Sequence, residues 1–383
     1  MLLQNNFGLA NWVPMNNHKN VLILDPAGNM WGSERVLLDF IGSGFIQAGS
    51  FALCCPAEGP LAEAAVKTGL TVFPYFEANL HKRGKFARFI AAIGLYVSCR
   101  KFRADVIYVN QAGATRIALI VGRILGIPVV PHVRLLEDVW YLAELVPSEE
   151  QIPHVIVVSE FIGRAFDGSK LKSRVRILYD AYKFSNKTEM GKEISPHITR
   201  LCCAGRLVPI KGQHVLIEAV SLLKLEGIFV RLDFFGTSQA GERYEDSLRK
   251  LVVDLDLSDD VTFHGFVNDI TAEMKKYQVV ICPSEIEPLG RVIFEAWDAH
   301  CVPIVGAFSG GGAEVISKSG GGVLYLEQTP DSLAAAIKKC LQLTREQRED
   351  LVYRGRHWLM AHCNPEVYAR RLNQLFSEDG ESI

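Results

Sequence analysis

The chain has 383 residues, of which 49% are hydrophobic and 22% charged, with a formal net charge of −2. This length predicts two domains, and the composition excludes an intrinsically disordered chain. No apolar run reaches the roughly 18 residues that a membrane-spanning helix needs, and residues 1–18 are too polar for a signal peptide.

The first half of the chain alternates short apolar runs with helical segments. Because this rhythm is typical of βαβ units, it predicts an α/β fold with a doubly wound parallel sheet. Ligands of such sheets bind beyond the carboxyl ends of the strands, where residues 25–32, Asn110, His132, Arg134 and Ser159 lie. Strands are expected at 21–25, 51–55, 71–75, 106–110, 127–133 and 154–159, and helices at 34–48, 61–69, 86–101 and 115–125.

A basic segment follows the third predicted strand. Residues 80–103 carry seven cations and no acid, with aromatic and aliphatic residues at helical spacing between them. Such a basic amphipathic helix favours contact with an anionic membrane surface. The alternative is a helix packed in the domain core with solvated basic ends. Nucleic acid is not predicted as a partner, because the chain has no overall basic excess and no recognition motif. The cations are Lys82, Arg83, Lys85, Arg88, Arg100, Lys101 and Arg103.

A second α/β rhythm begins after residues 183–199, which are polar, lack periodicity and read as a linker. We therefore predict a Rossmann-like N-terminal domain at 1–183, a linker at 184–199 and a second Rossmann-like domain at 200–364. A final helix follows the break at Asn364-Pro365. The strands of the second half are expected at 201–205, 230–236, 261–266, 279–283, 302–306 and 322–326.

The nine cysteines include two adjacent pairs, Cys54-Cys55 and Cys202-Cys203, inside predicted strands. Neighbouring strand residues point to opposite faces of a sheet, so these pairs are not expected to form disulfides. No CxxC spacing indicates zinc. Buried free thiols fit a reducing cytoplasm, which is the predicted location.

The segment 283–305 carries the chemistry around which the rest is arranged. A buried strand ends at Cys282, and a helix is expected from about Arg291 to His300, so that backbone N–H groups of its first turn form an anion site. Glu287 lies in the preceding loop, and Glu295 leans back toward the anion from one turn inside the helix. A plain helix covering a sheet explains the apolar residues here, but not Glu295 set between Phe294 and Ala296, since a buried carboxylate without partners is costly.

These residues carry a resemblance to a known family. EPLGRVIFEA resembles the E-x7-E signature of retaining glycosyltransferases with the GT-B fold, most closely glycosyltransferase family four, also described as glycosyl transferases group 1. CAGRLVPIKGQHVLIEA at 203–219 is similar to the family's Gly-Arg and Lys-Gly element, and WGSERVLLDF at 31–40 to its N-terminal glycine loop. The resemblance implies two Rossmann-like domains facing across a cleft, with the C-terminal helix, 365–383, packed back on the first domain.

The leaving diphosphate of a nucleotide-sugar needs fixed donors and cations, because negative charge develops there. Arg206 and Lys211 suit this, although alone they would read as solvated loop cations. The resemblance assigns Glu287 to the donor sugar or diphosphate and Glu295 to the ribose. The family often has a histidine at the position of His132, near the donor sugar or the acceptor. The predicted catalytic residues are thus His132, Arg206, Lys211 and Glu287. The predicted donor-binding residues are Gly32, Arg206, Lys211, Gly236, His264, Glu287, Leu289, Gly290 and Glu295.

No metal or other cofactor is predicted. Asp254 and Asp256 spell an Asp-x-Asp pair, but they fall at a helix end and the turn into a strand, which favours a structural reason for their presence. Glu314 follows the Gly310–Gly312 turn where the family has a proline at the position of Ala313, so no direct role is predicted for it.

The sequence thus predicts a retaining hexosyltransferase that uses a nucleotide-sugar donor and a glycan or lipid-linked acceptor, in surface polysaccharide or glycolipid biosynthesis. It would be cytoplasmic, at the inner face of a membrane if residues 80–103 bind there. A sugar-nucleotide epimerase with this fold, or a catalytically silent partner subunit that binds sugar nucleotide, remain as alternatives. Acceptor-dependent release of nucleoside diphosphate separates the three.

Overall fold

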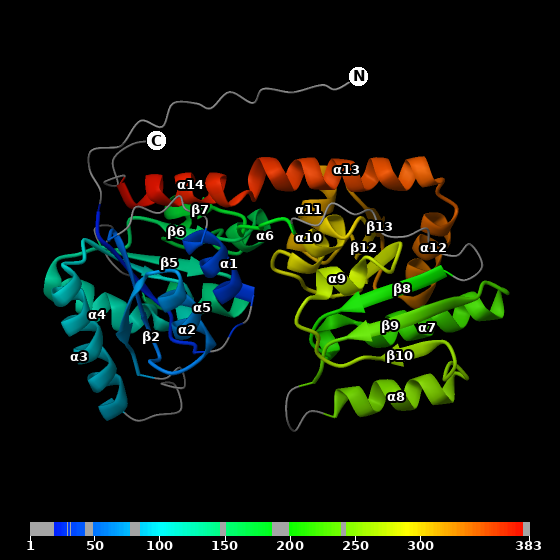
Figure 1. The fold of residues 1–383 in the computed structure, drawn as a ribbon, viewed down its shortest axis with the longest axis horizontal. Helices are drawn as coiled ribbons and strands as arrows, with labels where there is room; N and C mark the ends of the chain where they lie inside the picture. Colours follow the sequence, from blue (N-terminus) through cyan, green and yellow to red (C-terminus); the bar gives the residue numbers. More distant parts are fainter. Residues whose placement is uncertain are drawn as a thin grey trace, which may run out of the picture.

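The computed structural model describes residues 19–28, 30, 32–42, 49–76, 85–145, 151–185, 199–238 and 243–377. Within these ranges the chain forms two α/β domains side by side, each built on a parallel sheet (Figure 1). The predicted pair of doubly wound domains is therefore confirmed. No helix in these ranges combines the length and the apolar character that crossing a bilayer requires.

The N-terminal domain has a seven-stranded parallel sheet in the described residues, ordered β3-β2-β1-β4-β5-β6-β7. One face packs on α1, α2 and the last helix of the chain, and the other on α3 and α4. The strands are β1 Val21–Leu24, β2 Phe51–Cys55, β3 Thr71–Pro74, β4 Val106–Val109, β5 Val129–Val133, β6 Val155–Val157 and β7 Val175–Ile177. The helices are α1 Gly32–Ile41, α2 Pro60–Lys67, α3 Lys85–Phe102, α4 Thr115–Leu125, α5 Leu136–Leu145 and α6 Glu160–Arg164.

The C-terminal domain repeats this plan with six strands in the described residues, ordered β10-β9-β8-β11-β12-β13. Hydrophobic clusters fill both faces of the sheet. The strands are β8 Thr199–Ala204, β9 Val230–Phe235, β10 Val261–Phe263, β11 Val279–Cys282, β12 Val302–Gly306 and β13 Val323–Tyr325. The helices are α7 Gln213–Leu225, α8 Tyr244–Asp254, α9 Ile270–Met274, α10 Arg291–Asp298, α11 Gly311–Ser319, α12 Pro330–Leu341, α13 Arg345–His362 and α14 Pro365–Ser377.

The last helix returns to the first domain. Tyr368 and Phe376 on α14 are buried in the core that holds α1 and β2, and the rings of Phe40 and Tyr368 meet edge to face at 5.6 Å. The backbone N–H of Tyr182, where the chain leaves the first domain, donates to the carbonyl of Cys363, where it comes back, at 2.8 Å. The two crossings between the domains therefore lie side by side.

The structure differs locally from the sequence predictions at β7 and at α1. Strand β7 was not predicted, because it is a three-residue edge strand that is only partly buried. The predicted helix 34–48 ends at Ile41 in the described residues, while 43–48 lie outside them. All nine cysteines are unpaired and buried, including the two adjacent pairs for which strand alternation predicted no disulfide.

The strand orders locate the site. In each sheet, two strands that are not consecutive along the chain lie next to each other at the point where the winding reverses: β1 beside β4, and β8 beside β11. Loops diverge from the carboxyl ends of such strand pairs and leave a crevice there. The loops after β1 and β8 accordingly meet between the two domains.

Candidate active site

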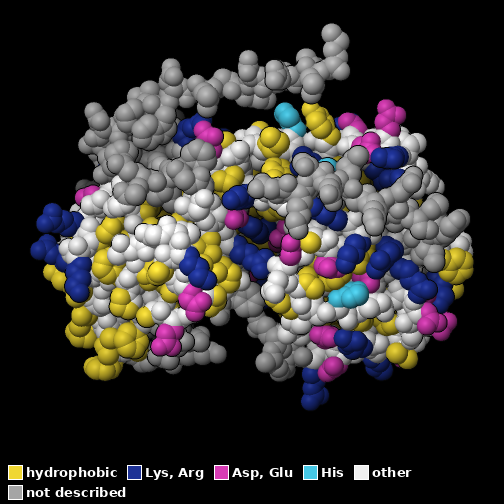
Figure 2. Space-filling model, in the orientation of Figure 1, with side chains coloured by type: hydrophobic (Ala, Val, Ile, Leu, Met, Phe, Trp, Pro, Cys, Tyr) yellow, Lys and Arg dark blue, Asp and Glu magenta, His cyan; other side chains and the backbone are white. Residues whose placement is uncertain are grey.

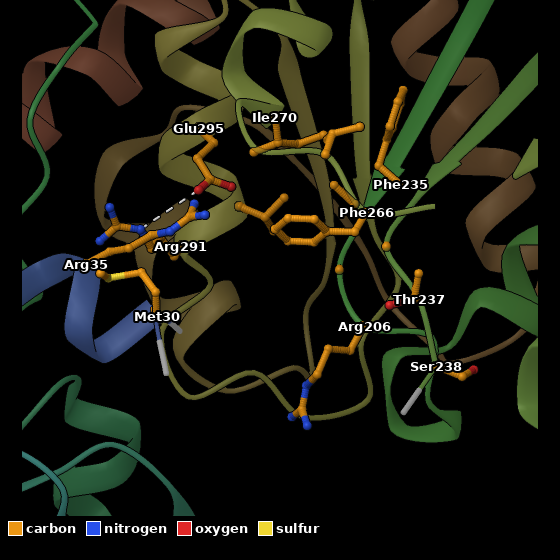
Figure 3. Close-up of a pocket in the computed structure, with 16 residues that line it drawn as sticks. Met30, Arg35, Arg206, Phe235, Thr237, Ser238, Phe266, Ile270, Arg291 and Glu295 are labelled. Atoms are coloured by element: carbon orange, nitrogen blue, oxygen red, sulfur yellow. Dashed lines mark ion pairs between the residues drawn. The ribbon is translucent and has the colours of Figure 1, made fainter. Parts of the chain in front are cut away.

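A cavity of about 520 Å³ lies between the domains. The N-terminal domain contributes Met30, Gly32 and Arg35, from the loop after β1 and from α1. The C-terminal domain contributes the loop ends after β8 and β9, the segment from Phe266 to Ile270, and the start of α10. In Figure 3, Arg35, Arg291 and Glu295 lie together on one side of the cavity, and Arg206 lies on another. Three guanidinium groups thus face a space whose described lining holds one carboxylate.

The start of α10 depends on a glycine. Gly290 precedes the helix with φ +87°, a left-handed conformation that other residues adopt only with strain, and a Cβ there would meet Ile293 Cδ1 at 2.8 Å. Leu289 and Gly290 are themselves buried, so the cavity wall begins one residue later, at Arg291. Because the first N–H groups of a helix lack intrahelical partners, α10 begins with donors beside the cavity.

Glu295 lies on the cavity wall, as its predicted role requires. Burial raises the pKa of its carboxyl, and the positive charges of Arg291 and Arg35 oppose that rise. Arg291 Nε stands 3.8 Å from the carboxylate, and the same guanidinium reaches Asp39 on α1 at 3.2 Å. Arg291 therefore joins the two domains beside Glu295, so a ribose binding to Glu295 would meet an arginine already in contact with it.

Lys211 and Glu287, 76 residues apart, form an ion pair at 2.5 Å. Both are largely buried, and Ser284 also donates to the Glu287 carboxylate at 3.2 Å. The backbone of Glu287 is fixed by hydrogen bonds with Ser309 and Gly311, which hold the loop against the glycine turn. The structure thus brings these two predicted residues together, although neither forms part of the cavity wall as described.

Gly32, Arg206 and Gly236 also lie on the cavity wall. Gly236 has φ +133°, and a Cβ on it would stand 1.9 Å from the carbonyl oxygen of Gly205, so no larger residue fits. His264 is not on the wall. Its ring stacks on Phe235 at 4.7 Å and its Nε2 pairs with Asp233 at 2.5 Å. It therefore supports the Phe235 side of the cavity from behind rather than facing the cavity itself.

His132 is placed differently from the prediction. It is fully buried, its Nδ1 lies 2.6 Å from the Tyr108 hydroxyl, and burial followed by the charge of Arg134 lowers the pKa of its imidazole. Among the described residues Nε2 has no hydrogen-bond partner. The prediction assumed that a histidine at a strand end faces the cleft, whereas this one faces the sheet side covered by α14, where Tyr108 packs on Phe376. This geometry does not support contact between His132 and a ligand in the cavity.

Sequence reasoning missed Arg35, Arg291 and Phe266 on the wall. Arg35 and Arg291 stand inside motifs that were recognised, and a count of helical turns could have placed Arg291 beside Glu295, four residues on. Nothing in the sequence shows that Arg35 lies near Glu295, because their proximity depends on how the domains face each other.

Glu314 joins the domains at a second point. Its carboxylate oxygens accept from the backbone N–H groups of Glu160 at 3.1 Å and Phe161 at 2.9 Å, at the start of α6. The Tyr179 hydroxyl donates to the same carboxylate at 2.7 Å. Glu314 thus caps an N-terminal-domain helix from the C-terminal domain, which explains this glutamate although no direct role was predicted for it.

Residues 191–358 match the family described as glycosyl transferases group 1. The C-terminal domain belongs to that family. The match confirms the resemblance stated from the sequence. It covers Arg206 and Glu295 on the cavity wall and the Lys211–Glu287 ion pair near it.

Curated relatives match a little under half of the chain. The GDP-mannose-dependent alpha-(1-6)-phosphatidylinositol monomannoside mannosyltransferase of Mycobacterium tuberculosis is 29% identical over 186 residues, 46% of this chain and 47% of the relative. The lipopolysaccharide core biosynthesis glycosyltransferase LpsE of Rhizobium meliloti is 31% identical over 173 residues, 45% of this chain and 48% of the relative. The chain spans about half the length of the relatives it matches.

Solved structures match the whole fold. The structure of Anabaena HepE in complex with UDP and glucose matches with a TM-score of 0.78 at 21% identity. The match covers 94% of this chain and 100% of HepE. A glycosyltransferase from Rickettsia africae has a TM-score of 0.79 at 15% identity over 96% of this chain and 100% of its own. These likenesses confirm the GT-B fold, and at such identities they carry the fold alone.

Proposed function

We propose that this chain is a retaining hexosyltransferase that moves a sugar from a nucleotide-sugar donor to a hydroxyl of a glycan or lipid-linked acceptor. The observation that carries the proposal is the interdomain cavity, whose wall holds Arg35, Arg206 and Arg291 together with the start of α10 and Glu295. A nucleoside diphosphate needs such an arrangement, with cations and helix N–H groups for its phosphates and a carboxylate for its ribose hydroxyls.

In the proposed reaction, the bond between the anomeric carbon and the diphosphate oxygen breaks, and the acceptor oxygen bonds to the same face of that carbon. The acceptor proton passes to the departing phosphate, so no protein nucleophile takes part. Arg206 would stabilise the charge that develops on the diphosphate. Lys211 would act from its pair with Glu287. In the described part of the chain, Lys211 and Ser284 both donate to Oε2 of Glu287, so Oε1 would bind a sugar hydroxyl.

The proposal requires no metal ion. Asp254 ends α8, and Asp256, in the following turn, pairs with Lys224 at 3.5 Å, which gives these two residues a structural explanation. The described residues hold no group of three or more His, Cys, Asp or Glu suited to a metal. Transfer should therefore survive excess EDTA. Loss of activity that magnesium or manganese restores would reject this part of the proposal.

The acceptor and location rest on the relatives. One is named for a phosphatidylinositol mannoside and another for lipopolysaccharide core, which supports an acceptor in glycolipid or surface polysaccharide biosynthesis. The UDP in the Anabaena complexes makes a UDP-sugar the first donor to test, and the mannosyltransferases make a GDP-sugar the second. Nine buried free thiols fit the reducing cytoplasm where we place the reaction.

The deciding experiment measures nucleoside diphosphate release with and without acceptor, after a thermal-shift screen of UDP-, GDP- and ADP-sugars has chosen the donor. A ligand present at 100 times its dissociation constant stabilises a protein by about 2.7 kcal/mol, which such a screen detects. Release that depends on acceptor, with the α-configured donor sugar giving an α-linked product, supports the proposal. Interconversion of sugar nucleotides without release would indicate an epimerase, and donor binding without turnover would indicate a silent subunit.

A further inference from the structure

An apolar surface without a partner in the described residues lies on the outside of the N-terminal domain, over α3 and α4. On α3, Phe86 is 75% exposed, Phe89 63% and Ile93 47%, and Val97 continues the row one turn later. The spacing of three and four residues places them in a single stripe along the helix. These side chains do not lie in the domain core, whereas Ala91, Leu95 and Cys99 on the other side of α3 do.

Helix α4 adds to the same surface. The two helices pack against each other on one face of the sheet, with Leu95 of α3 and Val121 of α4 in the shared core. Ile120 and Ile124 of α4 point outward and are 51% and 66% exposed. Figure 2 shows hydrophobic side chains gathered over the lower part of this domain and Lys and Arg side chains at its outer edge. Monomeric soluble proteins rarely expose so many large apolar residues together.

The charge of this surface has one sign. Helices α3 and α4 carry no Asp or Glu, whereas Arg88, Arg100 and Lys101 on α3 and Arg116 and Arg123 on α4 are exposed. Acidic residues lie outside the two helices: the exposed Asp105 in the loop after α3, and Glu137 and Glu144 on α5 near the exposed Trp140. Of the cations expected from the sequence, Lys82 and Arg83 lie outside the described residues.

We propose that the outer face of α3 and α4 docks on the surface of an anionic lipid bilayer. Aromatic and aliphatic side chains would enter the region between headgroups and acyl chains, while the arginines and Lys101 bind lipid phosphates. A single protein partner would need acidic and apolar groups in matching positions, but a bilayer offers both everywhere. This proposal stands on the surface alone and does not depend on the proposed reaction.

The docked orientation would serve a lipid-linked acceptor. Helices α3 and α4 begin on the side of the sheet where the strands end, because each follows a parallel strand. That is also the edge from which Met30 and Gly32 reach the interdomain cavity. The bilayer would therefore lie beside the N-terminal domain, on a route to the cleft, and the group 1 domain would remain in solution.

The test is flotation of the full chain with vesicles of phosphatidylcholine alone or mixed with phosphatidylglycerol. The wild type should float with the mixed vesicles, stay in the dense fraction with phosphatidylcholine, and lose binding as salt rises. Two double variants, Phe86→Ser with Phe89→Ser and Arg100→Glu with Lys101→Glu, should each weaken binding by about tenfold or more, and the second should also reduce the salt dependence.

Matched controls come from the other domain. Leu225→Ser with Phe229→Ser removes two exposed apolar side chains, and Lys250→Glu with Lys339→Glu reverses two exposed charges; both pairs should bind vesicles like the wild type. If the wild-type protein remains in the dense fraction with the mixed vesicles at low salt, the proposal is overturned. A concentration-dependent dimer that the Phe86 and Phe89 variant converts to monomer also overturns it, since the face would then bind a second copy. Turnover of a soluble acceptor should not change in any of these variants, which separates this result from a failure of the proposed reaction.

Discussion

The two domains repeat one architecture but place their charges differently. In the C-terminal domain, Arg206, Arg291 and Glu295 stand at strand and helix ends where they line the cavity. In the N-terminal domain, the polar side chains at the equivalent strand ends are buried and bind one another. Asp25 is fully buried and accepts from Asn110 at 2.7 Å, and Arg134 binds Asn110 and pairs with Asp180 inside the domain. A polar residue at a strand end is thus not sufficient to identify a ligand contact, because the same position can also hold the loops of the fold together.

The largest effect of this difference between the domains is expected from substitutions at the proposed donor site of the C-terminal domain. Arg206→Ala and Lys211→Ala should each reduce the rate of transfer by about 100-fold or more, because they remove positive charge from a leaving group that becomes more negative in the transition state. Steady-state kinetics with a saturating acceptor would measure this. Unchanged thermal melts would show that the fold is intact, and near-normal turnover in either variant would contradict the proposed donor site.

A second test concerns the contact that joins the domains. Glu314→Ala should lower the free energy of unfolding by about 3 kcal/mol, since two backbone N–H groups at the start of α6 and the Tyr179 hydroxyl lose a charged acceptor. Urea unfolding would measure it, with Glu327→Ala on an exposed turn as the control. A loss no larger than in the control would mean that the domains do not depend on this cap.

The buried charges of the N-terminal domain predict a dependence on pH. Burial and the neighbouring Glu34 raise the pKa of Asp25 to about 7, while the hydrogen bonds from Asn110 and Ala27 oppose this rise. Between about pH 4 and 7 the unfolded carboxyl has lost its proton and the folded one retains it, so stability should fall as pH rises and the full loss should be present above pH 7.

Asp25→Asn should remove this dependence and stabilise the protein by about 2 kcal/mol at pH 8, with a smaller gain at pH 5. Thermal melts across this range would measure the difference. A wild type whose stability does not change between pH 5 and 8 would show that the network holds Asp25 as a carboxylate throughout.

The smallest effect is expected at His132. His132→Gln should lower stability by about 1 kcal/mol through lost contact with Tyr108 and leave the rate of transfer within about threefold of the wild type. Parallel measurement of melts and turnover would separate the two quantities. A drop in rate as large as that of Arg206→Ala, without loss of stability, would place His132 in the reaction and remove the contrast between the domains.

The sequence predicted most of the fold and the C-terminal half of the site. The apolar runs of a parallel sheet are distinctive, and Glu295 could be recognised because an ionised group inside an apolar helix needs a partner. The facing of His132 could not be predicted, since β5 is buried on both sides and its residues give no period-two signal. Helical spacing grouped Phe86, Phe89 and Ile93 on one face of α3, but it could not show whether that face met the core or solvent.

The hydrogen bond between Tyr182 and Cys363 has a mechanical consequence. Because the chain passes between the domains twice at one place, we expect this double connection to act as a hinge for any opening of the cleft. The same connection makes the chain divisible. With Tyr368 and Phe376 in the core of the first domain, a fragment from β8 onward would carry a helix that the other fragment requires, so two separately made halves should find each other and rebuild the cleft.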